Sequence, residues 1–165
     1  LNHIIKETVE LLSGQCDEKG VALLTDLDES MPPVPVDADG IQQAILNLLL
    51  NGLDVVTPKT GVLTVRSRFD PHANEAVIDV EDNGPGIDAS EMTGIFRAFH
   101  SSKGQAGTGL GLAVVKKIVE EHGGHVTVDS DPGEGANFVL HLPVTTVKDA
   151  DASGTAGPPR RTKRF

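Results

Sequence analysis

The order in which helical and strand-like patterns follow one another is the feature that most constrains how this chain folds. Three segments carry apolar residues at helical spacing, namely about 1–16, 39–56 and 109–122. Two pairs of segments alternate apolar and polar residues across a turn-rich stretch, namely 61–69 with 75–82 and 125–130 with 136–142. Because hairpins rather than regular βαβ units dominate, we predict an α+β two-layer sandwich, in which about three helices cover one face of a mixed, largely antiparallel sheet.

The composition excludes several classes of partner. The chain of 165 residues has a net charge of −10, no Trp or Tyr and only five Phe. Nucleic acids and anionic membranes require basic surfaces, and single strands also require aromatic side chains for stacking, so we expect no nucleic-acid binding and no direct membrane contact. Cys16 is the one cysteine, and we find no signal peptide and no apolar run of the roughly 18 residues that span a bilayer, so we expect a cytoplasmic location.

The predicted helix 39–56 carries a polar stripe on an otherwise apolar surface. Gln43, Asn47, Asn51 and Asp54 follow at intervals of four, four and three residues, which places them on one side of the helix. Such a stripe is the ordinary solvent face of an amphipathic helix. The asparagines also permit a second interpretation, because an amide oxygen suits a Mg²⁺ ion that takes its other ligands from water and nucleotide phosphates.

The strand-like segment 75–82 ends in the stretch VEDNGPG. Asp82 has the same parity as the apolar residues two, four and six positions before it, so the face that buries them also receives its carboxylate. A carboxylate at the edge of a core needs a partner, and the exocyclic amine of a purine is one. Gly84 and Gly86 would then turn with positive φ and let the backbone approach a flat ring. An ordinary turn at the end of a strand explains the same residues equally well.

The stretch GTGLGL, residues 107–112, opens the third predicted helix. The N–H groups at a helix N-terminus favour phosphate. The stretch has Leu112 where a dinucleotide-binding fingerprint has glycine, and Leu110 where a Walker-type loop has lysine. Lys103 is the nearest upstream cation for a terminal phosphate, although a lone lysine in a loop is usually solvated.

The remaining reactive residues form no recognisable set. His122 and His125 are separated by the Gly-Gly that ends a helix, and no acid or cysteine completes a zinc site with them. Cys16 in an amphipathic helix is more typical of a core residue than of a nucleophile.

In this order, four motifs resemble the ATP-binding catalytic domain of bacterial sensor histidine kinases, which belongs to the GHKL superfamily shared with DNA gyrase and MutL. ILNLLLNGLD resembles the asparagine box, DNGPG the first glycine box, IFRAF with SSK the phenylalanine box and lid, and GTGLGL the second glycine box. The resemblance covers residues 1–143 and implies a Bergerat-type fold that binds Mg·ATP. We expect residues 144–165 to be a disordered tail.

The resemblance also implies a role for each matching position. Asp82 would bind the adenine amine, Asn51 would coordinate Mg²⁺ with Asn47 beside it near the phosphates, and Phe96 and Phe99 would anchor the lid. Asn47 and Lys103 would be the catalytic residues, with Lys103 on the γ-phosphate. The implied nucleotide-binding positions are Asn47, Asn51, Asp54, Asp82, Gly84, Gly86, Ile87, Phe99, Lys103, Gly107, Thr108, Gly109, Leu110 and Gly111.

The residue at position 47 separates two chemistries. Hydrolysing members of this superfamily carry Glu there, which activates water as a general base, whereas the amide of Asn47 has no comparable basicity. The resemblance therefore implies transfer of the γ-phosphoryl group to a histidine, catalysed by positioning and charge. Two alternatives stay open: an ATPase of the gyrase or MutL kind, and a nucleotide-binding regulatory module that transfers no phosphate.

The chain departs from the family pattern at several positions. Gly52 replaces an alanine, which is expected to cost its helix up to about 1 kcal/mol, and Ala98 and His100 replace a frequent proline and aromatic beside the lid. The phosphoacceptor motif is missing, because His3 is followed by IIKET. We therefore expect a C-terminal fragment whose partners are its own dimerisation and phosphoacceptor domain and a response regulator.

Overall fold

The structure is a computed structural model that describes residues 1–97 and 109–144. Within these ranges, five strands form one sheet in the order β1-β2-β3-β5-β4. The strands are β1 (Ala22–Leu27), β2 (Val62–Asp70), β3 (Glu75–Asp82), β4 (His125–Asp131) and β5 (Gly135–Pro143). β1 runs parallel to β2 and the other neighbours are antiparallel, so the prediction of a mixed, largely antiparallel sheet is confirmed.

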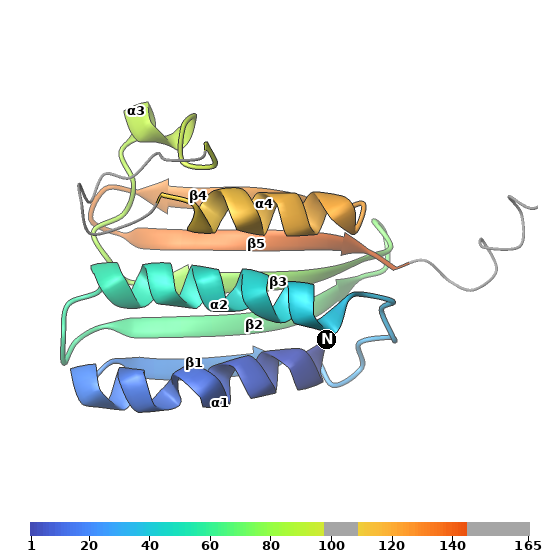
Figure 1. Cartoon of the computed structure of the whole chain (residues 1–165), viewed down its shortest axis with the longest axis horizontal. Coiled ribbons are helices and arrows are strands. Elements are labelled where there is room, and N and C mark those ends of the chain that lie inside the picture. Colours follow the sequence, from blue (N-terminus) through green and yellow to red (C-terminus); the bar gives the residue numbers. More distant parts are fainter. Residues whose placement is uncertain (98–108, 145–165) are drawn as a thin grey trace, which may run out of the picture.

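Three long helices lie side by side on one face of the sheet (Figure 1): α1 (Asn2–Lys19), α2 (Ala38–Val55) and α4 (Gly111–Glu121). This arrangement confirms the predicted two-layer sandwich. A fourth helix, α3 (Ala89–Met92), is a single turn that lies away from this layer. The helix ends at Met92 because a turn begins at Thr93.

The core lies between the helices and the sheet. Ile5 of α1, Ile45 of α2, Ile78 of β3 and Leu140 of β5 are all 0% exposed. Cys16 of α1 is 1% exposed in the same core, where burial raises the pKa of its thiol above the ordinary value. The thiol is therefore a buried core group, as the sequence predicts.

The ends of α2 and α4 are joined by one histidine. Asp37 is the N-cap residue of α2, but its side chain makes no capping hydrogen bond. Its backbone N–H instead donates to Nε2 of His122 over 3.0 Å, and Nδ1 of His122 donates to the carbonyl of Ile118 over 2.7 Å. Nε2 of His122 therefore joins the end of α4 to the start of α2, and the bond from Nδ1 to Ile118 within α4 orients the ring.

The last described residue belongs to the folded unit. Val144 is 4% exposed, and its N–H donates to the carbonyl of Asn74 over 2.9 Å. Residues 145–165 lie outside the described ranges, so the boundary at 143 and the disordered tail stay predictions. In the described ranges, no helix is long and apolar enough to cross a bilayer.

A glycine in the middle of α1 provides a test of helix stability. Gly14 is exposed, and a Cβ added to it would meet no atom within 4 Å. We predict that Gly14→Ala raises the free energy of unfolding by about 0.5–1 kcal/mol, measured by urea denaturation, because alanine favours the helix. Gly52→Ala in α2 is the matched control, since its Cβ would lie 2.7 Å from Cδ2 of the buried Leu63. An equal gain at both positions would contradict this expectation.

Candidate nucleotide-binding site

Three of the motif-bearing segments meet at one edge of the molecule. The C-terminal end of α2, the carboxyl end of β3 and the N-terminal end of α4 all lie at the left of Figure 1. They carry, in that order, the asparagine stripe, Asp82 with its glycine-rich loop, and Gly111. The contacts between them define the candidate site.

Asp82 is buried against α2. The residue is 8% exposed and lies on the face of β3 that packs against the helices, as its parity predicts. A Cβ added to Gly52 would lie 3.3 Å from Cβ of Asp82. Gly52 is unfavourable for helix formation, but its missing side chain lets α2 approach Leu63 and Asp82 closely.

The backbone that follows Asp82 folds back onto its carboxylate. The N–H of Gly84 donates to Oδ1 of Asp82 over 2.8 Å. A Cβ added to Gly84 would lie 2.7 Å from that oxygen and 2.9 Å from Cγ2 of Val55. The hydrogen bond fixes one oxygen of the carboxylate and therefore the orientation of the group.

The two positions in this loop require glycine for different reasons. Gly86 has φ +73°, as predicted. The prediction of a positive φ is wrong for Gly84, which must be small because Asp82 and Val55 occupy the space around it. Sequence alone does not separate these two requirements, since both select glycine.

Asn51 lies beside the first residue of α4. A Cβ added to Gly111 would lie 3.5 Å from Nδ2 and 3.7 Å from Oδ1 of Asn51. Asn47 is one turn earlier on the same stripe, and both asparagines are partly buried. Leu110, the N-cap residue of α4, has no polar side chain with which to cap the helix. The amide of Asn51 and the N-terminal N–H groups of α4 are therefore neighbours, and both favour a phosphate with its metal.

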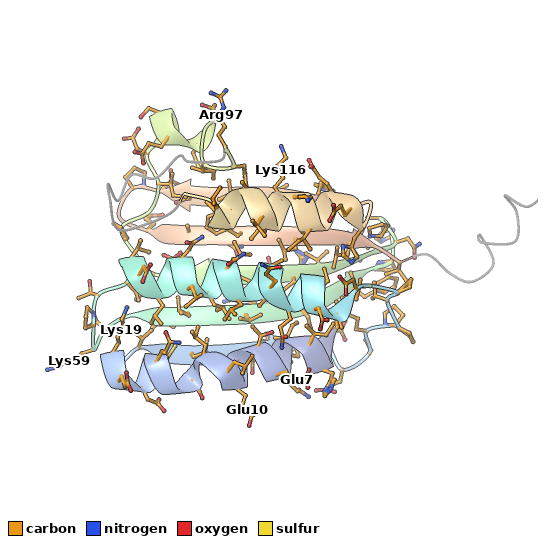
Figure 2. The ribbon with its side chains drawn as sticks, in the orientation of Figure 1. Glu7, Glu10, Lys19, Lys59, Arg97 and Lys116 are labelled. Atoms are coloured by element: carbon orange, nitrogen blue, oxygen red, sulfur yellow. The ribbon has the colours of Figure 1, made fainter. Side chains whose placement is uncertain are left out.

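Asp54 contacts a different helix. Its side chain is 60% exposed and pairs with Nζ of Lys19 over 3.8 Å, while the same nitrogen donates to the carbonyl of Leu53 over 3.2 Å. Figure 2 places Lys19 at the end of α1 that lies beside the C-terminal end of α2. These contacts give Asp54 a structural role between α2 and α1, and its predicted part in nucleotide binding stays a prediction.

Part of the predicted lid is described. The ring of Phe96 packs edge to face on Phe138 of β5, with centroids 6.5 Å apart and an interplanar angle of 89°, which suits an anchor. Asp88 caps α3, and hydrogen bonds from the hydroxyl and N–H of Ser90 lower the pKa of Asp88 below its ordinary value. The following predicted residues lie outside the described ranges: Ala98, Phe99, His100, Lys103, Gly107 and Thr108.

The structure adds supporting residues that sequence reasoning missed. The side chain of Asn83 accepts from the N–H of Val62 over 2.7 Å and donates to the carbonyl of Thr60 over 3.0 Å, which fixes the loop to the start of β2. Ser130, at the end of β4, accepts from the N–H of Ile87 over 2.9 Å. The DNG turn pointed to Asn83 only as a turn residue, and no local pattern marked Ser130.

The donor set fits a metal that is held mainly by its nucleotide. Among the described residues, no group of three or more His, Cys, Asp or Glu side chains is placed to hold a metal ion. Mg²⁺ does not need such a cage, because it keeps several waters and binds substrate phosphates. The single amide oxygen of Asn51, with Asn47 beside it, is consistent with that mode of binding.

Comparison with known proteins identifies the family. Residues 36–146 match the family of histidine kinase-, DNA gyrase B- and HSP90-like ATPases, and the chain belongs to that family. It is 36% identical over 144 residues to the sensor histidine kinase ZraS of Klebsiella oxytoca, covering 87% of this chain and 30% of ZraS. It is 33% identical over 152 residues to the sensory histidine kinase/phosphatase NtrB of the same organism, covering 87% of this chain and 43% of NtrB. The chain thus spans less than half the length of these relatives.

Solved structures share the fold over most of the chain. The nucleotide-free catalytic domain of the histidine kinase ThkA superposes with a TM-score of 0.78 at 27% identity, covering 87% of this chain and 92% of that domain. Full-length ShkA in complex with AMPPNP superposes with a TM-score of 0.79 at 27% identity, covering 88% of this chain and 30% of ShkA. The predicted resemblance and fold are confirmed.

Proposed function

We propose that this chain binds Mg·ATP and supplies the γ-phosphoryl group to a histidine on a separate phosphoacceptor domain. The observation that carries the proposal is the meeting of Asp82 and Asn51 at the C-terminal end of α2. Asp82 packs against Gly52, and Asn51, the neighbour of Gly52, faces the first residue of α4. A carboxylate for a purine amine and an amide for a phosphate-bound metal therefore lie at one edge of the molecule.

Asp82 recognises the base in this proposal. Its carboxylate accepts the exocyclic amine of adenine, and the hydrogen bond from Gly84 keeps it oriented for that contact. Burial at 8% exposure strengthens the interaction, because a hydrogen bond to a charged acceptor is stronger where water is excluded. Gly86 and Ile87 continue the wall of the adenine pocket.

The phosphates lie toward α4. Bound Mg²⁺ would neutralise charge that develops on the transferred phosphoryl group. Asn51 holds the ion with its amide oxygen, Asn47 lies one turn away on the same stripe, and Gly109, Leu110 and Gly111 bring the N-terminal N–H groups of α4 to the phosphates. Gly107, Thr108 and Phe99 lie outside the described ranges, and their part in nucleotide binding rests on the family resemblance alone.

Asn47 favours transfer over hydrolysis. A neutral amide orients groups but does not remove a proton from water at neutral pH, so water is a poor acceptor in this site. Lys103 meets the γ-phosphate and offsets its charge as the acceptor histidine attacks. The histidine comes from the dimerisation domain of the parent protein, and a cytoplasmic response regulator then receives the phosphoryl group.

Removal of the metal ligand provides a direct test. We predict that Asn51→Ala lowers the affinity for Mg·ATP by about 10–100-fold, a range typical of lost support for a bound metal. The affinity for ATP in EDTA should change little, because the base contact is intact. Titration of a fluorescent ATP analogue with and without Mg²⁺ measures both values. Gln43→Ala on the same stripe is the control, and an equal loss in EDTA would contradict the assignment of Asn51.

Three functions are separated by one set of assays. Transfer of radiolabel from γ-labelled ATP to an added cognate dimerisation domain is expected for a histidine kinase. Steady release of phosphate by the isolated chain would favour an ATPase instead. Binding without either activity would favour a regulatory module.

A further inference from the structure

The turn between β4 and β5 packs against the loop that follows Asp82. We call residues 83–87 the adenine loop and residues 131–135 the β4–β5 turn. The N–H of Gly133 donates to the carbonyl of Pro85 over 2.7 Å. A Cβ added to Gly86 would lie 2.1 Å from the carbonyl oxygen of Asp131, and one added to Gly135 would lie 2.0 Å from that of Asp82. The adenine loop and the β4–β5 turn are therefore packed closely together through backbone atoms.

One side chain joins the two segments. The hydroxyl of Ser130 accepts from the N–H of Ile87 over 2.9 Å and donates to the carbonyl of Gly135 over 2.6 Å. The same hydroxyl thus holds the end of the adenine loop and closes the β4–β5 hairpin. At its N-terminal end, the loop is held by the hydrogen bonds of Asn83 with Thr60 and Val62.

The loop in turn controls the carboxylate of Asp82. One of its oxygens accepts from the N–H of Gly84, which lies within the loop. A displacement of the loop moves that N–H and rotates the carboxylate with it. Ser130 is therefore linked to the carboxylate of Asp82 through Ile87 and the adenine loop.

We propose that Ser130 is a positioning residue for recognition of the purine amine. The inference rests on the proposed function and deepens it, because it assigns selectivity for adenine to Ser130 at the end of β4 as well as to Asp82. Without the hydroxyl, the N–H of Ile87 loses its acceptor and the adenine loop keeps fewer of its anchors. The contact most sensitive to direction, that of the carboxylate with the amine, weakens first.

The experiment compares ATP with inosine triphosphate, which has an oxygen where adenine has its amine. Affinities for both Mg²⁺ complexes are measured by calorimetry on the whole chain, together with the melting temperature. We expect Ser130→Ala to weaken ATP binding roughly two- to tenfold, the effect of one lost hydrogen bond, and to change inosine triphosphate binding little. The ratio of the two affinities therefore falls.

Two further variants separate positioning from stability. Ser130→Thr keeps a hydroxyl and should restore the ratio. Ser67→Ala removes an equivalent hydroxyl far from the site, which donates to Asn2 over 2.7 Å and accepts from Asp28 over 3.2 Å. This control should lower the melting temperature and leave the ratio unchanged. If Ser130→Ala does not fold, Ser130→Cys replaces it with the same expectations.

Failure of this inference and failure of the proposed function give different results. A parent chain that binds neither nucleotide overturns the proposed function. A parent chain that prefers ATP, with the same preference in Ser130→Ala, overturns only the role of Ser130. Equal weakening of both nucleotides by Ser130→Ala also overturns it, because a merely structural residue would have that effect.

Discussion

Asp82→Asn is expected to remove most of the binding of Mg·ATP, with a loss of affinity of about 10–150-fold. The change keeps the size of the side chain and an oxygen that can accept from Gly84. It removes the negative charge and puts an NH₂ donor in place of the second oxygen, which the adenine amine requires as an acceptor. A hydrogen bond to a charged group contributes about 1.5–3 kcal/mol. Titration with a fluorescent ATP analogue measures the loss.

The chain offers a matched control for this change in the same strand. Asp79 of β3 is also 8% exposed, but it faces the opposite side of the sheet, where it pairs with Arg68 over 3.7 Å. Asp79→Asn should lower stability and leave nucleotide affinity unchanged. Binding by Asp82→Asn at the parent level would show that the adenine assignment is wrong.

Gly86→Ala is expected to cause the largest loss of stability among the glycine changes in the adenine loop. Alanine is strained at φ +73°, and its Cβ would lie 2.1 Å from the carbonyl oxygen of Asp131, so the β4–β5 turn must move. Strain and overpacking together predict a decrease of about 2–4 kcal/mol in the free energy of unfolding. Urea denaturation measures it, and nucleotide binding should weaken as well.

Substitution of Gly133 distinguishes backbone strain from overpacking. Gly133 has φ +89°, but a Cβ there would meet no atom within 4 Å. Gly133→Ala should therefore show only the cost of the backbone conformation, about 1–2 kcal/mol. If the two variants lose the same stability, close packing of the turn on the adenine loop contributes nothing measurable.

Much of the fold was predictable because it follows from local periodicity. The alternation in 75–82 predicts β3 with its observed bounds, and the parity of Asp82 predicts its burial. α1 extends three residues beyond the predicted end at Cys16, because the polar residues that follow carry no apolar signal and the helix stops at Gly20 with φ +66°. Polar ends of helices are where periodicity gives least information.

The candidate site was predictable only where the residues concerned lie in one helix or strand, whose regular geometry fixes their relative positions. Asn47 and Asn51 share a stripe because they share a helix. Ser130 and Ile87 are 43 residues apart, and their hydrogen bond depends on how two loops pack in space. The pairing of Asp54 with Lys19 joins two helices in the same way. Neither contact has a local pattern that would reveal it.

The pairing of β3 with β5 has a consequence for the order of assembly. The strands β2 and β3, and likewise β4 and β5, meet through short connections, whereas β1 reaches β2 only after the chain has crossed over through α2. The interval between β3 and β5 is longer still, because Leu27 pairs with Ser67, 40 residues later, and Asp82 pairs with Ala136, 54 residues later. Closing a longer loop costs more chain entropy, so we expect the β4–β5 hairpin to join β3 last. The nucleotide-facing edge is built from α2, β3 and α4, and α4 directly precedes this hairpin, so we expect the edge to be completed only in that last step.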